Sequence, residues 1–260
     1  MTTATASGPL RILPVTLGDL RACLAAGWQD FRRAPLFGVF FGAVYSLCGL
    51  LIYVILQIWQ IPWAILPLAV GFPLLGPFVA VGLYEVSRRL AAGAPLSWSA
   101  VLSVILRQKD RQIPSISAVI VGLFLLWLFI ADVIYALFLG LNTYERYGGL
   151  ADMLASANGI AMLSVGGAVG AGLAFVLFGV TAVSLPLLLD REVDFVTAMI
   201  TSFGVIRANP GPMLGWAVFI AMAMLAAMLP AFLGLLVVLP ILGHATWHLY
   251  KRALAPDEPG

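Results

Sequence analysis

The C-terminal part of the chain contains an apolar run that only a membrane protein is expected to carry. After Pro210, nearly forty residues pass without an Asp, Glu, Lys or Arg, and the run ends at Tyr250. A helix that crosses a bilayer needs about 20 predominantly apolar residues, so the run is too long for one crossing and fits two. Pro230, in the sequence MLPAFLG, disfavours a continuous helix and marks the expected turn.

The composition of the whole chain agrees with this interpretation. Of the 260 residues, 62% are hydrophobic and 10% are charged, whereas a soluble domain has about 25% charged residues. A soluble fold of this size could not hide so much apolar surface, because much of any folded surface faces solvent. The net charge of +2 is too small to indicate a nucleic-acid partner.

Apolar runs of spanning length recur along the chain and predict an all-α membrane protein with six transmembrane helices. We expect one membrane domain at residues 17–253, a disordered cytosolic tail at 1–16 and a second cytosolic tail at 254–260. The first tail is small and polar and contains two prolines, and it lacks the apolar core of a signal peptide. The expected spans are residues 36–58, 63–84, 117–139, 159–189, 212–229 and 231–250.

Lysine and arginine predict the orientation of these spans. With the N-terminus in the cytoplasm, thirteen basic residues face inward and only Arg146 faces outward. The prediction is therefore a multi-pass protein of the cytoplasmic (inner) membrane with both ends in the cytosol. The one outer loop of any size, residues 142–159, has room for a short interfacial helix.

A pattern repeats three times: an amphipathic segment, basic residues, a proline and then a pair of spans. Intervals of three and four place the apolar residues of each segment on one helix face. We expect these three helices to lie flat at the inner surface, with apolar side chains in the acyl boundary and arginines at anionic headgroups. The three stripes are Leu17, Leu20, Leu24, Trp28 and Phe31; Val101, Leu102, Ile105 and Leu106; and Val196, Met199, Ile200, Phe203 and Ile206.

The ends of the first and third units also match. GPFVAVGLYEVSRRL and LPILGHATWHLYKRAL each place a basic residue eleven positions after a proline, so Glu85 falls opposite His248. The match predicts that these two side chains meet where the units pack together. Two small-x-x-x-small pairs, Gly38 with Gly42 and Gly166 with Gly170, favour close packing of the helices.

These matched ends supply the main candidate site, a polar cluster at the inner face. Glu85 precedes Arg88 and Arg89 by one helical turn, which permits ion pairs. Either the group is an ordinary exit from the membrane, or it binds a lipid headgroup or a partner. The candidate residues are Tyr84, Glu85, Arg88, Arg89, His244, Trp247 and His248.

The two histidines share one helix face, a spacing that can serve a metal or a haem pair. They are the only histidines in the chain, and no acidic or thiol ligand lies near them in sequence. We therefore predict no metal site and no cofactor. No phosphate loop, zinc-protease motif, nucleophile elbow or dinucleotide fingerprint occurs, so no catalytic residue is predicted.

Asp132, in LFIADVIYAL, is the one acid well inside an expected span. An acid at this depth is costly and by default functional. Two interpretations stay open: a proton or ion role, or a structural hydrogen bond to a hydroxyl such as that of Tyr135 or Tyr144.

Four segments resemble a bacterial family of predicted integral membrane proteins that has no assigned function. They are GWQDFRRAP (27–35), GFPLLGPFVAVGLYEVSRRLAAG (71–93), SLPLLLDREVDFVTAM (184–199) and GHATWHLYKRA (243–253). The resemblance extends over residues 17–253 and implies an integral membrane protein. Members of such families are sometimes labelled as oxidase subunits, but the residues here do not support a catalytic one.

The sequence as a whole favours a non-catalytic protein of a bacterial inner membrane. Its expected partners are the lipid bilayer with its anionic headgroups, and a further membrane protein complex for which it acts as an accessory, assembly or scaffold component, or as a membrane organiser. The alternative is a small transporter or channel that uses a polar site near Asp132.

Overall fold

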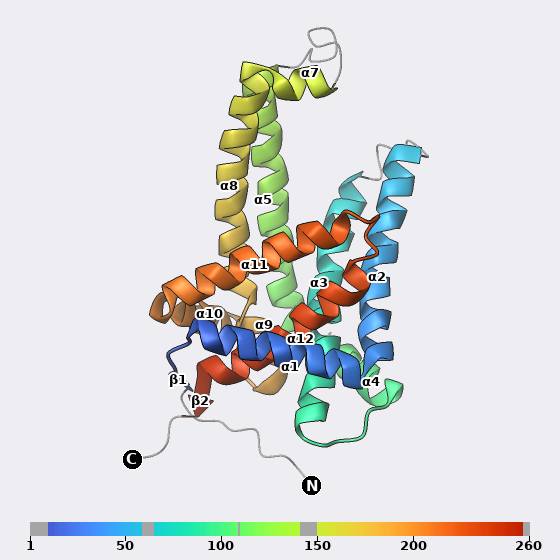
Figure 1. Cartoon of the computed structure of the whole chain (residues 1–260), viewed down its shortest axis with the longest axis vertical. Helices are drawn as coiled ribbons and strands as arrows, with labels where there is room; N and C mark the ends of the chain where they lie inside the picture. The colour runs from blue at the N-terminus through green and yellow to red at the C-terminus, as the bar shows by residue number, and fades with distance from the viewer. Residues whose placement is uncertain (1–9, 59–64, 109, 141–149, 257–260) are drawn as a thin grey trace.

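A computed structural model describes residues 10–58, 65–108, 110–140 and 150–256. The described chain is helical apart from one two-stranded ribbon. Two pairs of long helices rise side by side from a base of shorter helices (Figure 1).

Each rising pair is a helical hairpin. The first contains α2 (Pro35–Tyr53), which continues into a short π-helical turn (Val54–Ile58), and α3 (Ile65–Ala91). The second contains α5 (Ile113–Leu139) and α8 (Ala157–Thr181). The short helix α7 (Leu150–Ala155) precedes α8 and lies within residues 142–159, where the sequence has room for a short helix.

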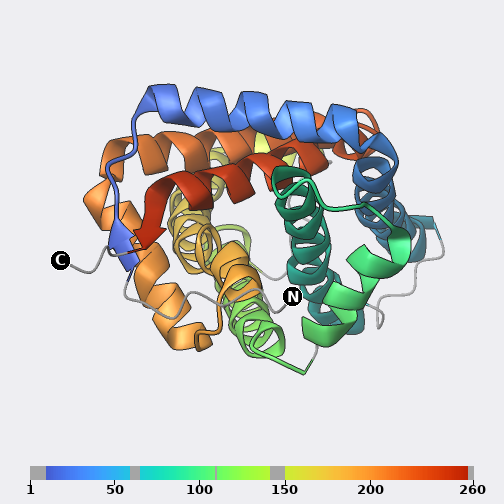
Figure 2. The same cartoon turned by 90° about the horizontal axis from the view of Figure 1, so that it is seen from below.

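The remaining helices form the base and a layer that crosses it. Seen from below, α1 and α12 run alongside each other at one edge of the molecule (Figure 2). α11 and α12 run obliquely to α5 and α8 (Figure 1). These helices are α1 (Leu17–Arg33), α4 (Trp98–Gln108), α9 (Ser184–Asp190), α10 (Phe195–Ala208), α11 (Pro210–Met228) and α12 (Leu235–Ala253).

Four of the six expected spans correspond to helices that are long and apolar enough to cross a membrane: Pro35–Tyr53, Ile113–Leu139, Ala157–Asp190 and Pro210–Met228. The second expected span begins at residues 63 and 64, which lie outside the described residues. The sixth corresponds to α12, whose second half mixes histidines and basic residues with apolar ones. The six-span count and the inward orientation of both ends stay predictions.

The fourth expected span is interrupted. α8 ends at Thr181 and α9 begins at Ser184, so residues 159–189 form two helices. Pro186 accounts for the break, because a proline ring opposes the carbonyl four residues earlier, here that of Ala182.

The prediction of a disordered tail at residues 1–16 is wrong from Leu10 onward. β1 (Leu10–Ile12) pairs antiparallel with β2 (Leu254–Pro256), which brings the two ends of the described chain together. Val15 is buried, and its N–H donates to Oδ1 of Asn209 at 2.7 Å. Residues 10–16 are ordered because they pair with β2 and bind Asn209, and both of these partners are distant in sequence. Residues 1–9 lie outside the described residues.

Two of the three expected units have the same joint between base helix and span. Ala34 (φ −134°, ψ 53°) joins α1 to α2, and Asn209 (φ −133°, ψ 54°) joins α10 to α11. Each joint is followed by a proline, which suits the first helical position because its missing N–H has no partner to lose there. The corresponding residue of the middle unit, Gln112, differs (φ −90°, ψ −11°). The threefold repeat therefore stays a prediction.

The face through which α1 packs on α12 was not predicted from the sequence, where the apolar stripe was expected to face the acyl boundary. α1 buries Leu20, Cys23, Gly27 and Asp30, whereas Leu17 and Trp28 of the predicted stripe are 61% and 46% exposed. A Cβ on Gly27 would lie 2.7 Å from the backbone nitrogen of Ala245 in α12. Close approach of two helices selects small side chains, so the small face of α1 lies inward and much of its large apolar face lies outward.

The predicted glycine pairs lie at helix contacts. A Cβ on Gly42 would lie 2.8 Å from the Cα of Leu236 in α12, and one on Gly170 would lie 2.9 Å from the Trp127 ring of α5. Gly167 and Gly172 of α8 have no such neighbour within 4 Å. One face of α8 therefore packs on α5, and small residues remain open elsewhere on the helix.

Candidate functional site

Four polar side chains meet where α1, α3 and α12 cross, and they are called the polar cluster below. Nε2 of His248 lies 2.7 Å from Oδ2 of Asp30, and Nδ1 of His244 lies 2.8 Å from Oγ of Ser87. Ser87 and His244 are fully buried, and Asp30 is 5% exposed. The polar cluster therefore ties three helices together inside an apolar base.

Glu85 pairs with two of its three predicted partners, the arginines of its own helix. Its two carboxylate oxygens accept hydrogen bonds from Nε of Arg88 and Nε of Arg89, each at 2.7 Å, and Glu85 is fully buried. The predicted proximity of Glu85 to both arginines is confirmed. The predicted pairing with His248 is wrong, because His248 pairs with Asp30.

The matched ends of α3 and α12 nevertheless contact each other. The rings of Tyr84 and Trp247 stack with centroids 6.4 Å apart, and Ser87 reaches His244. Each helical residue turns by about 100°, so Ser87 points about 200° away from Glu85 around the helix axis. Ser87 therefore faces α12 while Glu85 turns toward its own arginines.

Two members of the polar cluster, Asp30 and Ser87, were not predicted from the sequence. Asp30 follows Leu20, Cys23 and Gly27 at intervals of three, four and three, so it belongs to the small-residue face of α1. That spacing was the available indication that Asp30 lies inward. Ser87 carries no comparable indication, because its partner His244 is 157 residues away in sequence.

The environment of Asp30 keeps its carboxyl ionised. Burial alone raises the pKa of Asp30, but hydrogen bonds from His248 and Ser87 and the charge of His248 outweigh it, so the pKa lies below its ordinary value. Asp30 is therefore a carboxylate at neutral pH and a suitable acceptor for the His248 ring.

A second ion pair joins the beginning of α1 to the end of α12. Nε of Arg252 donates to Oδ1 of Asp19 at 2.8 Å. Asp19 also forms a capping box with Thr16, and the hydrogen bonds from Thr16, with help from Arg252, lower the pKa of Asp19 to about 2. α1 is thus held along α12 at both of its ends, by Asp19 with Arg252 and by Asp30 with His248.

The Ser87–His244 contact has the geometry of a nucleophile and its base. Both side chains are fully buried and neither lines either of the two cavities described below, so those cavities give a substrate no route to them. Nε2 of His244 is buried without a hydrogen-bond partner. Among the described residues, no group of three or more His, Cys, Asp or Glu side chains could hold a metal ion. The arrangement favours a structural role for the cluster.

Asp132 lies far from this cluster, on the second hairpin. It is exposed on α5, between the exposed side chains of Phe129 (68%) and Leu137 (76%). It lines none of the cavities discussed here, and Tyr144, one of the two predicted hydroxyl partners, lies outside the described residues. Asp132 thus faces the surroundings of the protein.

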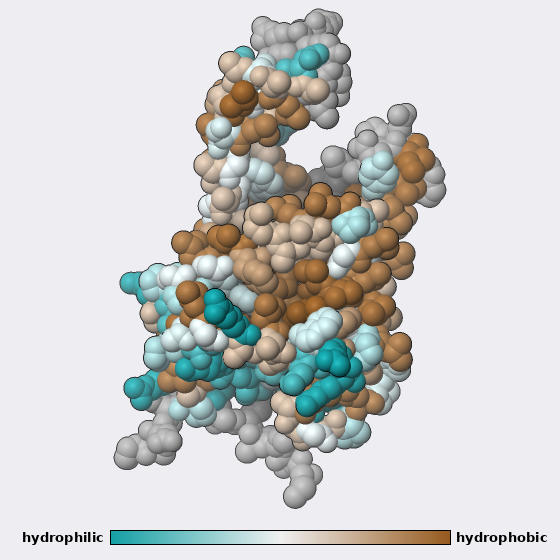
Figure 3. All heavy atoms as spheres, in the orientation of Figure 1, coloured by the Kyte–Doolittle hydropathy of each residue, from teal (hydrophilic) through white to brown (hydrophobic). Residues whose placement is uncertain are grey.

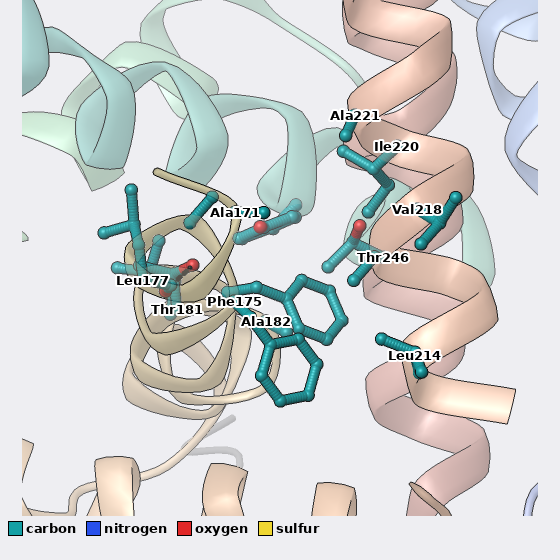
Figure 4. Close-up of a pocket in the computed structure, with 15 residues that line it drawn as sticks. Ala171, Phe175, Leu177, Thr181, Ala182, Leu214, Val218, Ile220, Ala221 and Thr246 are labelled. Carbon is teal, nitrogen blue, oxygen red and sulfur yellow. Dashed lines mark hydrogen bonds between the residues drawn. The ribbon is translucent and has the colours of Figure 1, made fainter. Parts of the chain in front are cut away.

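An apolar cavity of about 460 Å³ lies between α8 and α11 (Figure 4). Side chains of α3, α9 and α12 complete its wall. Leu214 and Val218 of α11 line it and are 52% and 54% exposed, so the cavity opens at the apolar surface. A smaller cavity of about 230 Å³ shares two lining residues with it, Ile220 and Thr246.

The apolar and polar surfaces of the molecule are separated. On the face seen in Figure 3, apolar residues cover the middle of the molecule, and hydrophilic residues gather over the base near the chain ends. This distribution is typical of a protein whose middle contacts lipid and whose base contacts water.

Comparison with known protein families gives a match over part of the chain. Residues 65–190 match the family described as "Predicted integral membrane protein (DUF2189)", whose function is unknown. No curated protein and no solved structure matches the chain. The matched residues contain α3, α4, α5, α8 and α9, and therefore Glu85, Ser87, Asp132 and part of the apolar cavity.

Proposed function

Since residues 65–190 match the DUF2189 family of predicted integral membrane proteins, we propose that the protein acts without catalysis, as an accessory or scaffold component of a membrane complex. The proposal depends most on Asp132, an acid exposed on a helix that is long and apolar enough to cross a membrane. An intramembrane acid that the described residues leave exposed needs a polar partner from another source.

The position of Asp132 along α5 would keep its carboxylate away from water. Asp132 precedes Leu139, the last residue of α5, by seven positions, which corresponds to about 10 Å along the helix axis. An aspartate side chain is too short to reach the interface over such a distance, unlike the long side chains of lysine and arginine. A hydroxyl, amide or basic group from a neighbouring membrane protein would satisfy it.

The rest of the α5–α8 hairpin agrees with a docking role. Only 17% of the most apolar stretch of α5 is buried within the chain. On α8, Ile160 and Leu163 are 56% and 53% exposed, and the open glycines Gly167 and Gly172 permit close approach of another helix. Small residues and a polar residue are the groups that drive helix association in lipid, where apolar side chains alone gain little.

The helices of the base would anchor this scaffold at the membrane surface. α1, α4 and α10 each end with exposed arginines: Arg32 and Arg33, Arg107, and Arg207. Each also exposes large apolar side chains, such as Leu106 (64%) and Ile200 (67%). This combination suits insertion at the acyl boundary with anionic headgroups over the arginines, at the cytosolic side of a bacterial inner membrane.

The alternative of a small transporter finds less support. A transporter that uses Asp132 would place this acid along an internal polar path. Asp132 instead lies on an outward surface, and the two cavities between the hairpins and α11 are lined almost entirely by apolar residues.

A purification in mild detergent tests the proposal. We expect the full-length chain to co-purify with a second membrane protein, identified by mass spectrometry, and Asp132→Leu to lose at least tenfold of it. Val133→Leu is the matched control, because Val133 is also exposed on α5 but apolar. A wild-type chain that purifies alone or only with copies of itself, or an Asp132→Leu variant that keeps the partner, would contradict the proposal.

A further inference from the structure

From the apolar cavity between α8 and α11 we infer that the protein binds one acyl chain of a membrane phospholipid there. This inference does not depend on the proposed accessory role. The volume of about 460 Å³ lies within the range of small-molecule sites. Five helices contribute side chains to the wall of this cavity, and almost all of these side chains are apolar.

The chemistry of the wall selects a hydrocarbon. No charged residue lines the cavity, and its polar members are Tyr84, Thr181 and Thr246. Both threonine hydroxyls donate within their own helices, Thr181 to the Leu177 carbonyl at 2.8 Å and Thr246 to the Leu242 carbonyl at 2.7 Å. Neither threonine needs a ligand, so the wall presents methyl, methylene and aromatic groups (Figure 4).

The position of the opening identifies the source of the ligand. Leu214 and Val218 are more than half exposed at the rim, on a helix that is apolar enough to span a membrane. The cavity therefore opens toward lipid. An acyl chain of a neighbouring lipid can enter sideways, whereas a soluble apolar ligand would have to cross the lipid first.

Tyr84 supplies the one polar contact that the site offers. Its side chain lines the cavity, is 4% exposed, and is held by stacking on Trp247. Within the described chain, no hydrogen bond to its hydroxyl occurs. The Tyr84 hydroxyl is thus free to donate to a ligand in the cavity, and the ester carbonyl at the head of an acyl chain is a fitting acceptor.

The smaller cavity gives the bound acyl chain room to extend. It adjoins the first at Ile220 and Thr246 and is lined mainly by apolar side chains, among them Leu83, Leu239 and Leu242. A long acyl chain that passes between Ile220 and Thr246 would remain surrounded by apolar groups.

Photolabelling tests this inference in full-length protein reconstituted into vesicles of phosphatidylcholine and phosphatidylglycerol. The probe is a phosphatidylcholine with a diazirine on one acyl chain, and labelled residues are mapped by mass spectrometry. We expect labels to concentrate on cavity residues of α8 and α11, such as Phe178 and Ala217. A parallel sample receives a diazirine-labelled free fatty acid.

Two variants and a control decide the result. Ala217→Phe fills the cavity and should reduce labelling of α8 at least fivefold, whereas Ala226→Phe, at an exposed position of the same helix outside the cavity, should not. Tyr84→Phe keeps the ring and should reduce labelling a few-fold, as expected for one lost hydrogen bond.

Several outcomes would overturn the inference. These are labels spread evenly over the exposed faces of α8 and α11, wild-type labelling in both Ala217→Phe and Tyr84→Phe, and labelling by the free fatty acid alone. Because Tyr84→Phe is a conservative change, it keeps the test decisive if Ala217→Phe does not fold.

Discussion

The base of the molecule and the α5–α8 hairpin differ in where their polar groups find partners. In the base, Asp30 pairs with His248 and Asp19 with Arg252, so α1 and α12 satisfy each other. On the hairpin, Asp132 is exposed on an apolar helix. The polar groups of the base thus pair with one another, whereas the polar group of the hairpin is left for a partner outside the described chain.

A large side chain at the α1–α12 contact should have the greatest effect. In Gly27→Leu, the Cβ alone would lie 2.7 Å from the Ala245 nitrogen and the Ile241 carbonyl oxygen, which are backbone atoms that cannot turn away. We expect a loss of about 3 kcal/mol or more in the free energy of unfolding, measured by SDS-induced unfolding.

The matched change on the hairpin is Gly172→Leu, since no atom lies within 4 Å of a Cβ there. Its unfolding free energy should stay within about 0.5 kcal/mol of wild type. Equal destabilisation by the two changes would remove the distinction between base and hairpin.

Removal of the Asp30 carboxylate should have the next largest effect. Asp30→Ala leaves the His248 ring without its partner, and because the His248 side chain is 25% exposed, the cost should be about 2 kcal/mol, below that of breaking a fully buried pair. A double-mutant cycle with His248→Ala checks the assignment. Additive losses would show that the two side chains do not stabilise each other.

The contribution of Asp30 should depend on pH with a defined sign. The folded-state pKa of Asp30 is lowered from 3.8, so its stabilisation is present above that value and disappears as the pH falls through the lower folded pKa. The stability difference between wild type and Asp30→Asn should therefore be constant near neutral pH and shrink in strong acid. A difference that grows in acid would contradict the assignment.

The smallest effect on stability is expected at Asp132. In detergent, after removal of any bound partner, Asp132→Asn should change the unfolding free energy by less than about 0.5 kcal/mol. A loss as large as that of Asp30→Ala would mean that Asp132 has an internal structural role after all, and the contrast with the base would fail.

Hydropathy was sufficient to locate four of the membrane helices, because the length and composition of a span are local properties of the sequence. The pairing of Glu85 with Arg88 and Arg89 was predictable for the same reason, since all three lie within one helical turn. The His248–Asp30 pair was not predictable, because the two residues are 218 positions apart.

The base helices show a second limit of prediction from the sequence. Their apolar stripes were expected to face the acyl boundary, and Trp28 of α1 is exposed. The face through which α1 packs on α12, with Cys23 and Gly27, was not predicted, because small residues that let two helices approach closely do not stand out in an apolar sequence. The order of Leu10–Ile12 was missed because strand pairing with Leu254–Pro256 joins opposite ends of the chain.

The most direct test of the account places a photocrosslinking amino acid on α5 in cells. At Phe129, which is 68% exposed and one turn from Asp132, we predict a crosslink to a second membrane protein. At Ile134, which is 8% exposed on the same helix, we predict crosslinks within the chain itself. If the Phe129 position yields only lipid adducts while the Ile134 position behaves as expected, the hairpin does not dock another membrane protein and the central claim is contradicted.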